Sequence, residues 1–244
     1  MQEIAYAGVM PRETLTREQI IRATVEILDA EGLDGLNMRR LGGRLGSAAT
    51  AVYWHVKSRD DLVILAGDEM WREVELPDVD KVGWRAAAMA MARDTYAMAR
   101  RHPWLLSAMG TYVVYGPNKA RVDDHMLGVY EAAGFSQDEA GEAATTVATF
   151  VVGTALSGAA DVSWRARLRR NGDDETLIEK KIAEVFAVAT QFPRLRAVID
   201  TYPVEDVVKE PEKDLDFGLR VIFDGLEARL AARPKRTRRS PARR

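Results

Sequence analysis

Apolar residues recur at intervals of three and four positions along most of this chain, which is the spacing of one face of an amphipathic helix. No segment alternates apolar and polar residues as a half-buried strand does. The sequence therefore predicts an all-α fold of about nine or ten helices. The predicted helices cover residues 16–32, 38–45, 48–55, 59–74, 84–101, 104–109, 118–133, 136–164, 174–190 and 215–232.

Polar residues mark several of the predicted helix ends. Thr16 with Gln19, and Ser136 with Glu139, have the spacing of capping boxes, in which each side chain bonds the other residue's backbone amide. Gly32 predicts the end of the first helix, because glycine readily adopts the left-handed backbone of a helix C-terminus. Two further N-caps are expected at Asn37 and Ser58.

Residues 36–62, LNMRRLGGRLGSAATAVYWHVKSRDDL, hold two helix-sized segments separated by a Gly46-Ser47 break. All the charged residues of this stretch that precede Asp60 are basic. A helix-turn-helix places its second helix in the major groove of DNA, and surrounding cations meet the phosphates. This stretch therefore predicts DNA binding. Its cations are Arg39, Arg40, Arg44, Lys57 and Arg59.

The second predicted helix, 48–55, combines small residues with a Tyr53-Trp54-His55 run. Alanine methyl groups allow a helix to approach the groove floor and to contact thymine methyl groups. Tyr53 and Trp54 point in different directions at helical spacing, so one face cannot bury both. Packing of these two aromatic residues inside the small N-terminal bundle is the alternative, and contact with DNA is the interpretation that we favour.

The amino-acid composition argues against several other classes of function. The chain of 244 residues has no cysteine, which excludes disulfides and thiolate metal sites. Its three histidines, His55, His102 and His125, form no catalytic or metal-binding motif with their neighbours. We therefore expect no enzyme activity, no metal and no cofactor. We see no signal peptide and no segment apolar enough to span a membrane, so we expect a soluble, cytoplasmic protein.

The segment EGLDGLNMRRLGGRLGSAATAVYWHVKSRDDL resembles the DNA-binding signature of the tetracycline-repressor family of bacterial regulators, over roughly residues 15–66. HPWLL and DFGLRVIFDGLEARL are similar to one branch's C-terminal domain, with less specificity. The resemblance implies an N-terminal three-helix DNA-binding domain and a larger helical ligand-binding domain. It also implies a homodimer that reads two palindromic half-sites of double-stranded operator DNA.

Position by position, the resemblance assigns base or phosphate contacts to this chain. Departures from the family pattern are Ser47, where an aliphatic turn residue is usual, and Met38 and Ala51, which replace hydroxyl-bearing residues of the family's namesake. The departure at Ser47 suggests different local packing, and those at Met38 and Ala51 argue against a shared operator. The assigned DNA contacts are Arg39, Ala49, Thr50, Ala51, Tyr53, His55, Lys57 and Arg59.

Residues 84–164 are rich in methionine and aromatic side chains, which adapt to irregular ligands and stack on planar ones. An apolar cavity with a few polar groups is a common small-molecule site, and ordinary core packing is the alternative. We expect a hydrophobic, polycyclic effector here. Its predicted contacts are Met91, Asp94, Thr95, Met98, Trp104, Met109, Tyr112, Met126, Tyr130, Thr146, Thr149 and Phe150.

Two segments, 143–160 and 215–230, are expected to form a four-helix interface between two protomers. The first offers small residues for close approach, and the second an apolar stripe. The alternative is that both helices are internal core. The predicted interface residues are Ala144, Ala148, Gly153, Ser157, Leu219, Ile222, Phe223 and Leu226.

The expected organisation is a flexible arm at 1–14, a DNA-binding domain at 15–62, an effector and dimerisation domain at 63–232, and a basic tail at 233–244. The tail carries seven Lys or Arg and no acid, although the whole chain has a formal charge of −2. A ligand-released repressor of an exporter, natural-product or resistance gene is the predicted function. A regulator without a small-molecule effector, controlled by a protein or acting as an activator, is the main alternative, and a helical enzyme or carrier is a more distant one.

Overall fold

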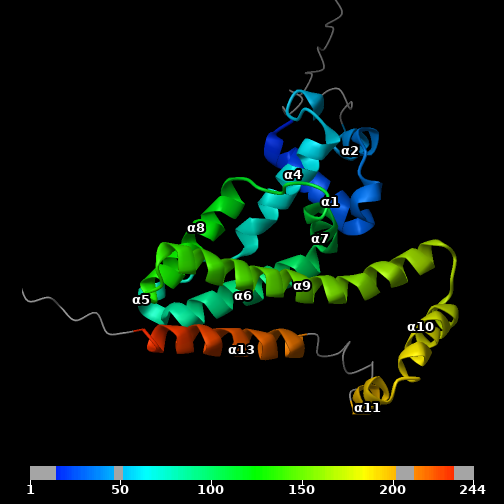
Figure 1. The fold of residues 1–244 in the computed structure, drawn as a ribbon. Helices are drawn as coiled ribbons and strands as arrows, with labels where there is room; N and C mark the ends of the chain where they lie inside the picture. The colour runs from blue at the N-terminus through cyan, green and yellow to red at the C-terminus, as the bar shows by residue number, and fades with distance from the viewer. Residues whose placement is uncertain (1–14, 47–51, 202–211, 234–244) are drawn as a thin grey trace, which may run out of the picture.

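The structure is a computed structural model that describes residues 15–46, 52–201 and 212–233, and within these ranges the chain is helical with no strand (Figure 1). The all-α prediction is confirmed. The helices are α1 (Arg17–Gly35), α2 (Met38–Arg44), α4 (Arg59–Met70), η1 (Trp71–Glu73), α5 (Val79–Val82), α6 (Trp84–Arg101), α7 (Pro103–Met109), α8 (Pro117–Ala132), α9 (Gln137–Arg170), α10 (Glu175–Ala189), α11 (Pro193–Thr201) and α13 (Glu212–Ala231).

The predicted N-caps are confirmed by hydrogen bonds. The Thr16 hydroxyl accepts from the Gln19 amide at 3.2 Å, and the Gln19 side chain accepts from the Thr16 amide at 2.9 Å. Asn37 caps α2 by accepting from the Arg40 amide at 2.9 Å. Ser58 caps α4 in the same way. These contacts satisfy amides at the first turn of a helix, which lack partners within the helix.

Other helix boundaries differ from the prediction. Gly32 has the expected positive φ of 69°, but it is a kink inside α1, which continues to Gly35. The predicted helix 59–74 ends at Met70 and tightens into the 3-10 turn η1. Helix α9 runs to Arg170, beyond the expected end at 164, and α5 and α11 were not predicted. Residues 47–51, and with them the first half of the predicted reading helix, lie outside the described residues.

The N-terminal unit, residues 15–58, is called the head here, and the part from η1 to α13 is called the body. Helix α4 joins them, so the expected domain boundary at residue 62 falls inside one helix. Helix α1 packs against α4 and α7, which places the head directly on the body (Figure 1). A displacement of α4 would therefore move the head with it.

The core of the body lies between α6, α8 and α9, with α13 alongside α9 (Figure 1). Met91, Tyr130 and Phe223 are fully buried there. Gly218 of α13 makes this packing close, since a Cβ at that position would lie 2.0 Å from the Phe150 ring. Apart from this core, α10 and the end of α9 form a second apolar cluster around Ile178. No helix of the described residues is long and apolar enough to cross a membrane.

Candidate nucleic-acid interface and body cavity

The segment after residue 51 presents polar and aromatic side chains outward from the head. Val52 and Val56 are buried and fix the segment to the head core. Between them, Tyr53 is 52% exposed and Trp54 is 89% exposed. His55 and Lys57 are also exposed. The alternative in which Tyr53 and Trp54 pack the interior is therefore wrong, and both remain available to a partner molecule.

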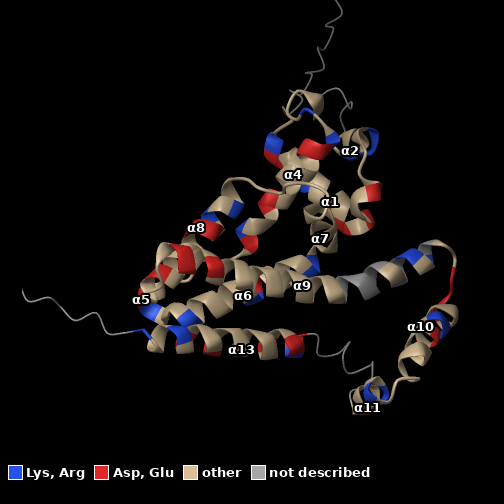
Figure 2. Cartoon of the chain, viewed as in Figure 1, with Lys and Arg blue, Asp and Glu red and all other residues tan. Residues whose placement is uncertain are grey.

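The three arginines of α2 differ in their partners. Arg40 forms an ion pair with Glu31 at 2.5 Å, and Arg44 forms one with Glu26 at 2.6 Å, both on α1. Arg39 is exposed and makes no ion pair with any described residue. Figure 2 shows basic residues on α2 and in the loops around it. Arg39 is thus the α2 arginine whose charge is not already balanced by α1.

Three of the predicted base contacts lie outside the described residues. They are Ala49, Thr50 and Ala51, at the predicted start of the reading helix. Their roles stay predictions. The described part of the expected DNA surface consists of Arg39, Tyr53, His55 and Lys57, with the exposed Trp54 as an addition that the assignment by resemblance omitted.

Arg59 does not belong to this surface, and its assignment as a DNA contact is corrected. Its guanidinium donates to the backbone carbonyls of Leu33 at 2.5 Å and Leu36 at 2.9 Å. It also donates to the Tyr112 hydroxyl at 3.2 Å. A planar guanidinium whose donors are used in this way is fixed inward. Arg59 therefore ties the end of α1 to α4 and to the loop before α8.

The N-terminus of α8 is capped by a residue of α4 rather than by its own flanking sequence. The Asp68 carboxylate, in a residue only 6% exposed, accepts from the amides of Asn118 at 3.2 Å and Lys119 at 2.9 Å. It also accepts from the Asn118 side-chain amide at 3.1 Å. A Cβ at Gly116 would come within 2.6 Å of this carboxylate, so glycine is required there. Asp68 therefore joins α4 to α8.

A third contact between head and body surrounds His102, where α6 meets α7. The imidazole bonds Asp29 of α1 at 2.6 Å and Glu73 of η1 at 2.9 Å through its two nitrogens. Burial alone raises the pKa of the Glu73 carboxyl, but hydrogen bonds from Arg101 and His102 outweigh it and hold that pKa below its usual value. The Trp104 indole N–H also donates to Asp29, at 2.7 Å.

A cavity of about 660 Å³ lies in the body, between α6, α8 and α9. Its size and largely apolar wall are typical of small-molecule sites. Four of the predicted effector contacts line it: Thr95, Met109, Met126 and Thr149. Three residues expected at the dimer interface, Ala144, Ala148 and Gly153, line it as well. The prediction did not include Trp71, which precedes the segment searched, or Lys119 and Asp123, which are ordinarily solvated charges.

The other predicted effector contacts do not line this cavity. Met91, Met98 and Tyr130 are buried core residues, and Phe150 packs against α13 at Gly218. The polar ones have partners within the protein, since Asp94 accepts from the Glu75 amide and Thr146 donates to the Glu142 carbonyl. The last two, Trp104 and Tyr112, bond Asp29 and Arg59.

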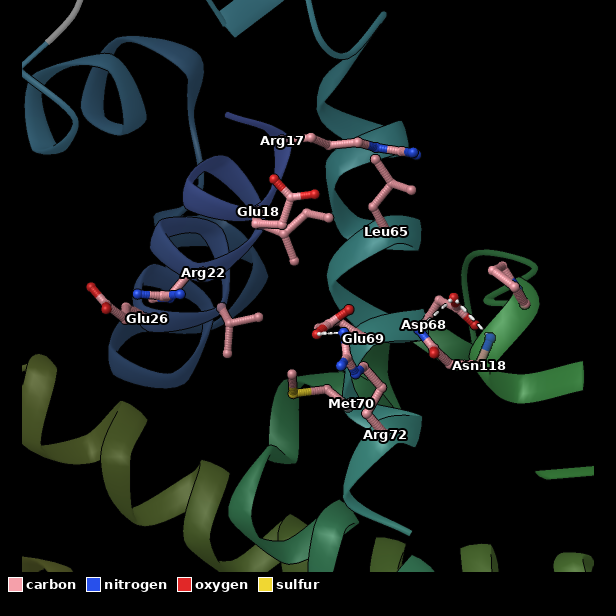
Figure 3. Close-up of a pocket in the computed structure, with 13 residues that line it drawn as sticks. Arg17, Glu18, Arg22, Glu26, Leu65, Asp68, Glu69, Met70, Arg72 and Asn118 are labelled. Atoms are coloured by element: carbon pink, nitrogen blue, oxygen red, sulfur yellow. Dashed lines mark hydrogen bonds and ion pairs between the residues drawn. The ribbon is translucent and has the colours of Figure 1, made fainter. Parts of the chain in front are cut away.

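A second, larger opening of about 790 Å³ is lined by residues of α1, α4, η1 and the start of α8 (Figure 3). Arginines and carboxylates alternate around it, and one such pair, Arg72 with Glu69, is joined at 3.2 Å. A wall of mixed charge is a poor match for a hydrophobic effector, because binding would remove water from charged groups without replacing it. The cavity of the body is the better candidate for such a molecule.

The predicted dimer residues of α13 divide into two groups. Leu219 and Phe223 are fully buried in the protomer, which leaves them no surface for a second copy, and their assignment is corrected. Ile222 and Leu226 are partly buried against the core. The outward face of α13 instead carries Phe217, 65% exposed, and Val221, 55% exposed.

Comparison with known proteins agrees with a helical protein that has a DNA-binding head and a ligand-binding body. The family described as "Tetracyclin repressor-like, C-terminal domain" matches residues 76–230. The HTH-type transcriptional repressor DrrR1 of Streptomyces coeruleorubidus is 35% identical over 231 residues, which cover 91% of this chain and 81% of that protein. The chain belongs to the tetracycline-repressor family of transcriptional regulators.

Two further members of the tetracycline-repressor family are similar to this chain over most of its length. The class A tetracycline repressor from transposon 1721 of Escherichia coli is 29% identical over 86% of this chain and 89% of its own length. ActR of Streptomyces coelicolor, crystallised in complex with actinorhodin, is 28% identical, with a TM-score of 0.69 over 89% of this chain and 97% of its own. The proteins of this family are regulators, in agreement with the expectation of no enzyme activity.

Proposed function

We propose that this protein is a homodimeric transcriptional repressor that binds a palindromic operator and is released by a hydrophobic small molecule in the body cavity. The observation that carries the proposal is the connection between an exposed aromatic and basic head surface and an apolar cavity. Helix α8 lines the cavity, and Asp68 joins its N-terminus to α4, which carries the head. Small-molecule binding by the relative ActR supports the same role for this cavity.

The mechanism is a shift between two arrangements of the heads. A dimer reads two half-sites only when its heads are separated by about 34–36 Å or a multiple of a DNA turn. An effector that fits the cavity better when α8 is displaced favours the arrangement in which α4 and the head move away from this register. Coupling of this kind is typically about 1–3 kcal/mol. The repressed gene, by the family resemblance, encodes an exporter, natural-product or resistance function.

Operator binding is tested with the purified full chain and the DNA that flanks its own gene, at fixed physiological salt, against a scrambled duplex. We expect selective binding by the wild-type protein. Arg39→Ala should weaken it by about 1–3 kcal/mol, as expected for a lost base or phosphate contact. Arg40→Ala is the matched control, because Arg40 is already paired with Glu31. Equal binding to both duplexes would overturn the proposal.

The dimer is proposed to form through α9 and the outward face of α13. Phe217 and Val221 are exposed apolar residues one turn apart on that face, and Ala144, Ala148, Gly153 and Ser157 remain the expected contacts of α9. We expect Phe217→Asp to shift the sedimenting mass toward that of a monomer at micromolar concentration. Val82→Asp, at an exposed valine of α5, is the control and should leave the mass unchanged.

A further inference from the structure

One end of the body cavity is polar, although most of its wall is apolar. Lys119 and Asp123, one turn apart on α8, form an ion pair there, and Trp71 of η1 lies beside them. The Lys119 ammonium lies 4.6 Å from the centre of the Trp71 ring. Its side chain is only 19% exposed, so its charge is largely removed from water. Three polar or charged groups therefore meet at one end of a site otherwise suited to a hydrocarbon body.

The Trp71 indole N–H has no hydrogen-bond acceptor among the described residues, and the residue is only 5% exposed. A buried donor without an acceptor costs about 1–3 kcal/mol, and native proteins rarely leave one. By contrast, the indole N–H of Trp104 is bonded to Asp29. The indole nitrogen is itself covered by protein atoms, so an acceptor brought by a ligand would satisfy this donor only after the side chains around Trp71 shift.

The position of Lys119 favours the same kind of ligand atom. Its backbone amide is bonded to Asp68 at 2.9 Å, which fixes the start of α8 beside the cavity. Its ammonium has three donor hydrogens and one carboxylate partner, Asp123, whose side chain is 40% exposed. An oxygen anion at this end of the cavity would accept from both Lys119 and Trp71, and Asp123 would turn toward solvent.

We propose that the effector bears an acidic oxygen, as a carboxylate or an ionised phenol or enol, which binds Lys119 and the Trp71 N–H. Its apolar body lies against Val122, Met126 and Val151, which line the same cavity. This inference rests on the proposed function only in taking the cavity as the effector site. It adds the chemical class of the effector and the two residues that recognise its polar end.

The test uses three fluorescent probes that share one ring system and differ in the polar group. They are 9-anthracenecarboxylate, 9-anthracenemethanol and 9-(aminomethyl)anthracene, each titrated into the full-length protein. We expect the carboxylate to bind most tightly. Lys119→Met should weaken the carboxylate by about tenfold and leave the alcohol nearly unchanged, because a charged hydrogen bond is lost for one probe only. Asp123→Asn should strengthen the carboxylate.

Trp71→Phe keeps an aromatic ring but removes the N–H, and it should also weaken the carboxylate more than the alcohol. Trp84→Phe, at a tryptophan that does not line the cavity, is the matched control for loss of an indole. Tighter binding of the amine, dependent on Asp123, would overturn the proposal. Equal or undetectable binding of all three probes would also do so. Operator binding is measured on the same protein preparation. It tests the proposed function independently of the order of affinities of the three probes.

Discussion

Replacing Asp68 by alanine removes the contact that joins α4 to the start of α8. In the wild-type protein its carboxylate accepts hydrogen bonds from the amides of Asn118 and Lys119 and from the Asn118 side chain. The side chain is almost fully buried, and no residue flanking α8 caps that helix with its side chain. The substitution therefore leaves two backbone donors of α8 without a partner, in a place that water reaches poorly.

The size of the effect follows from these contacts. Removing an ordinary N-cap costs about 1 kcal/mol, and a hydrogen bond to a charged group contributes about 1.5–3 kcal/mol. Burial makes the unsatisfied amides more costly, whereas loss of a buried charge offsets part of the change. We expect Asp68→Ala to lower the free energy of unfolding by about 2–4 kcal/mol. Asp68→Asn, which retains an acceptor, should cost about 1 kcal/mol.

Urea unfolding at one fixed protein concentration measures both variants, because dimerisation makes apparent stability depend on concentration. Asp78→Ala is the matched control, since Asp78 caps the short exposed helix α5 through a 3.2 Å bond to the Asp80 amide. It should cost about 0.5–1 kcal/mol. If Asp68→Ala costs no more than Asp78→Ala, then capping from α4 does not stabilise α8 as argued.

Three other outcomes are expected. Gly218→Ala should lower stability by about 1–2 kcal/mol in urea unfolding, because its Cβ would overlap the Phe150 ring, and Phe150→Leu should restore part of this loss. The backbone amide of Ser136 and the Arg233 side chain lower the pKa of Glu139 from 4.5 to about 2, so its contribution to stability is complete above pH 4.5 and is lost as the pH falls toward 2. Glu139→Gln should flatten that part of an acid titration, and an unchanged profile would contradict this. Arg59→Met should lower thermal stability without changing the salt dependence of operator binding, whereas Lys57→Met should reduce the salt slope by about one.

Local features of the fold were predictable from the sequence because their causes are local. Thr16, Asn37 and Ser58 cap their helices through atoms three residues away, and these spacings are visible in the sequence. Gly32 was only half predictable. Its positive φ follows from being glycine, but continuation of α1 to Gly35 was not evident from the local pattern. The family resemblance likewise rests on a short, nearly continuous stretch of the head.

The site was less predictable, because long-range neighbours decide which side chains line it. Met91 and Met109 are equally plausible effector contacts in the sequence, yet of these two only Met109 lines the cavity, and Met91 is buried in the core. Arg59 has the spacing of a DNA contact, but carbonyls at Leu33 and Leu36 and the distant Tyr112 hold it inward. Lys119 gave no signal, since a lysine in the first turn of a helix is ordinarily a solvated charge. Its importance depends on Trp71, from which it is separated in the sequence by α5, α6 and α7.

The exposure of Trp54 gives this protein an intrinsic optical probe at the proposed DNA surface. Of the five tryptophans, at 54, 71, 84, 104 and 164, Trp54 alone is highly exposed; Trp71 and Trp104 are buried, and Trp84 and Trp164 are partly buried. Its indole emission should therefore be quenched by iodide in the free protein and protected when a duplex covers the head. Occupancy of the operator can thus be followed without a label, and on the same protein used for effector titrations.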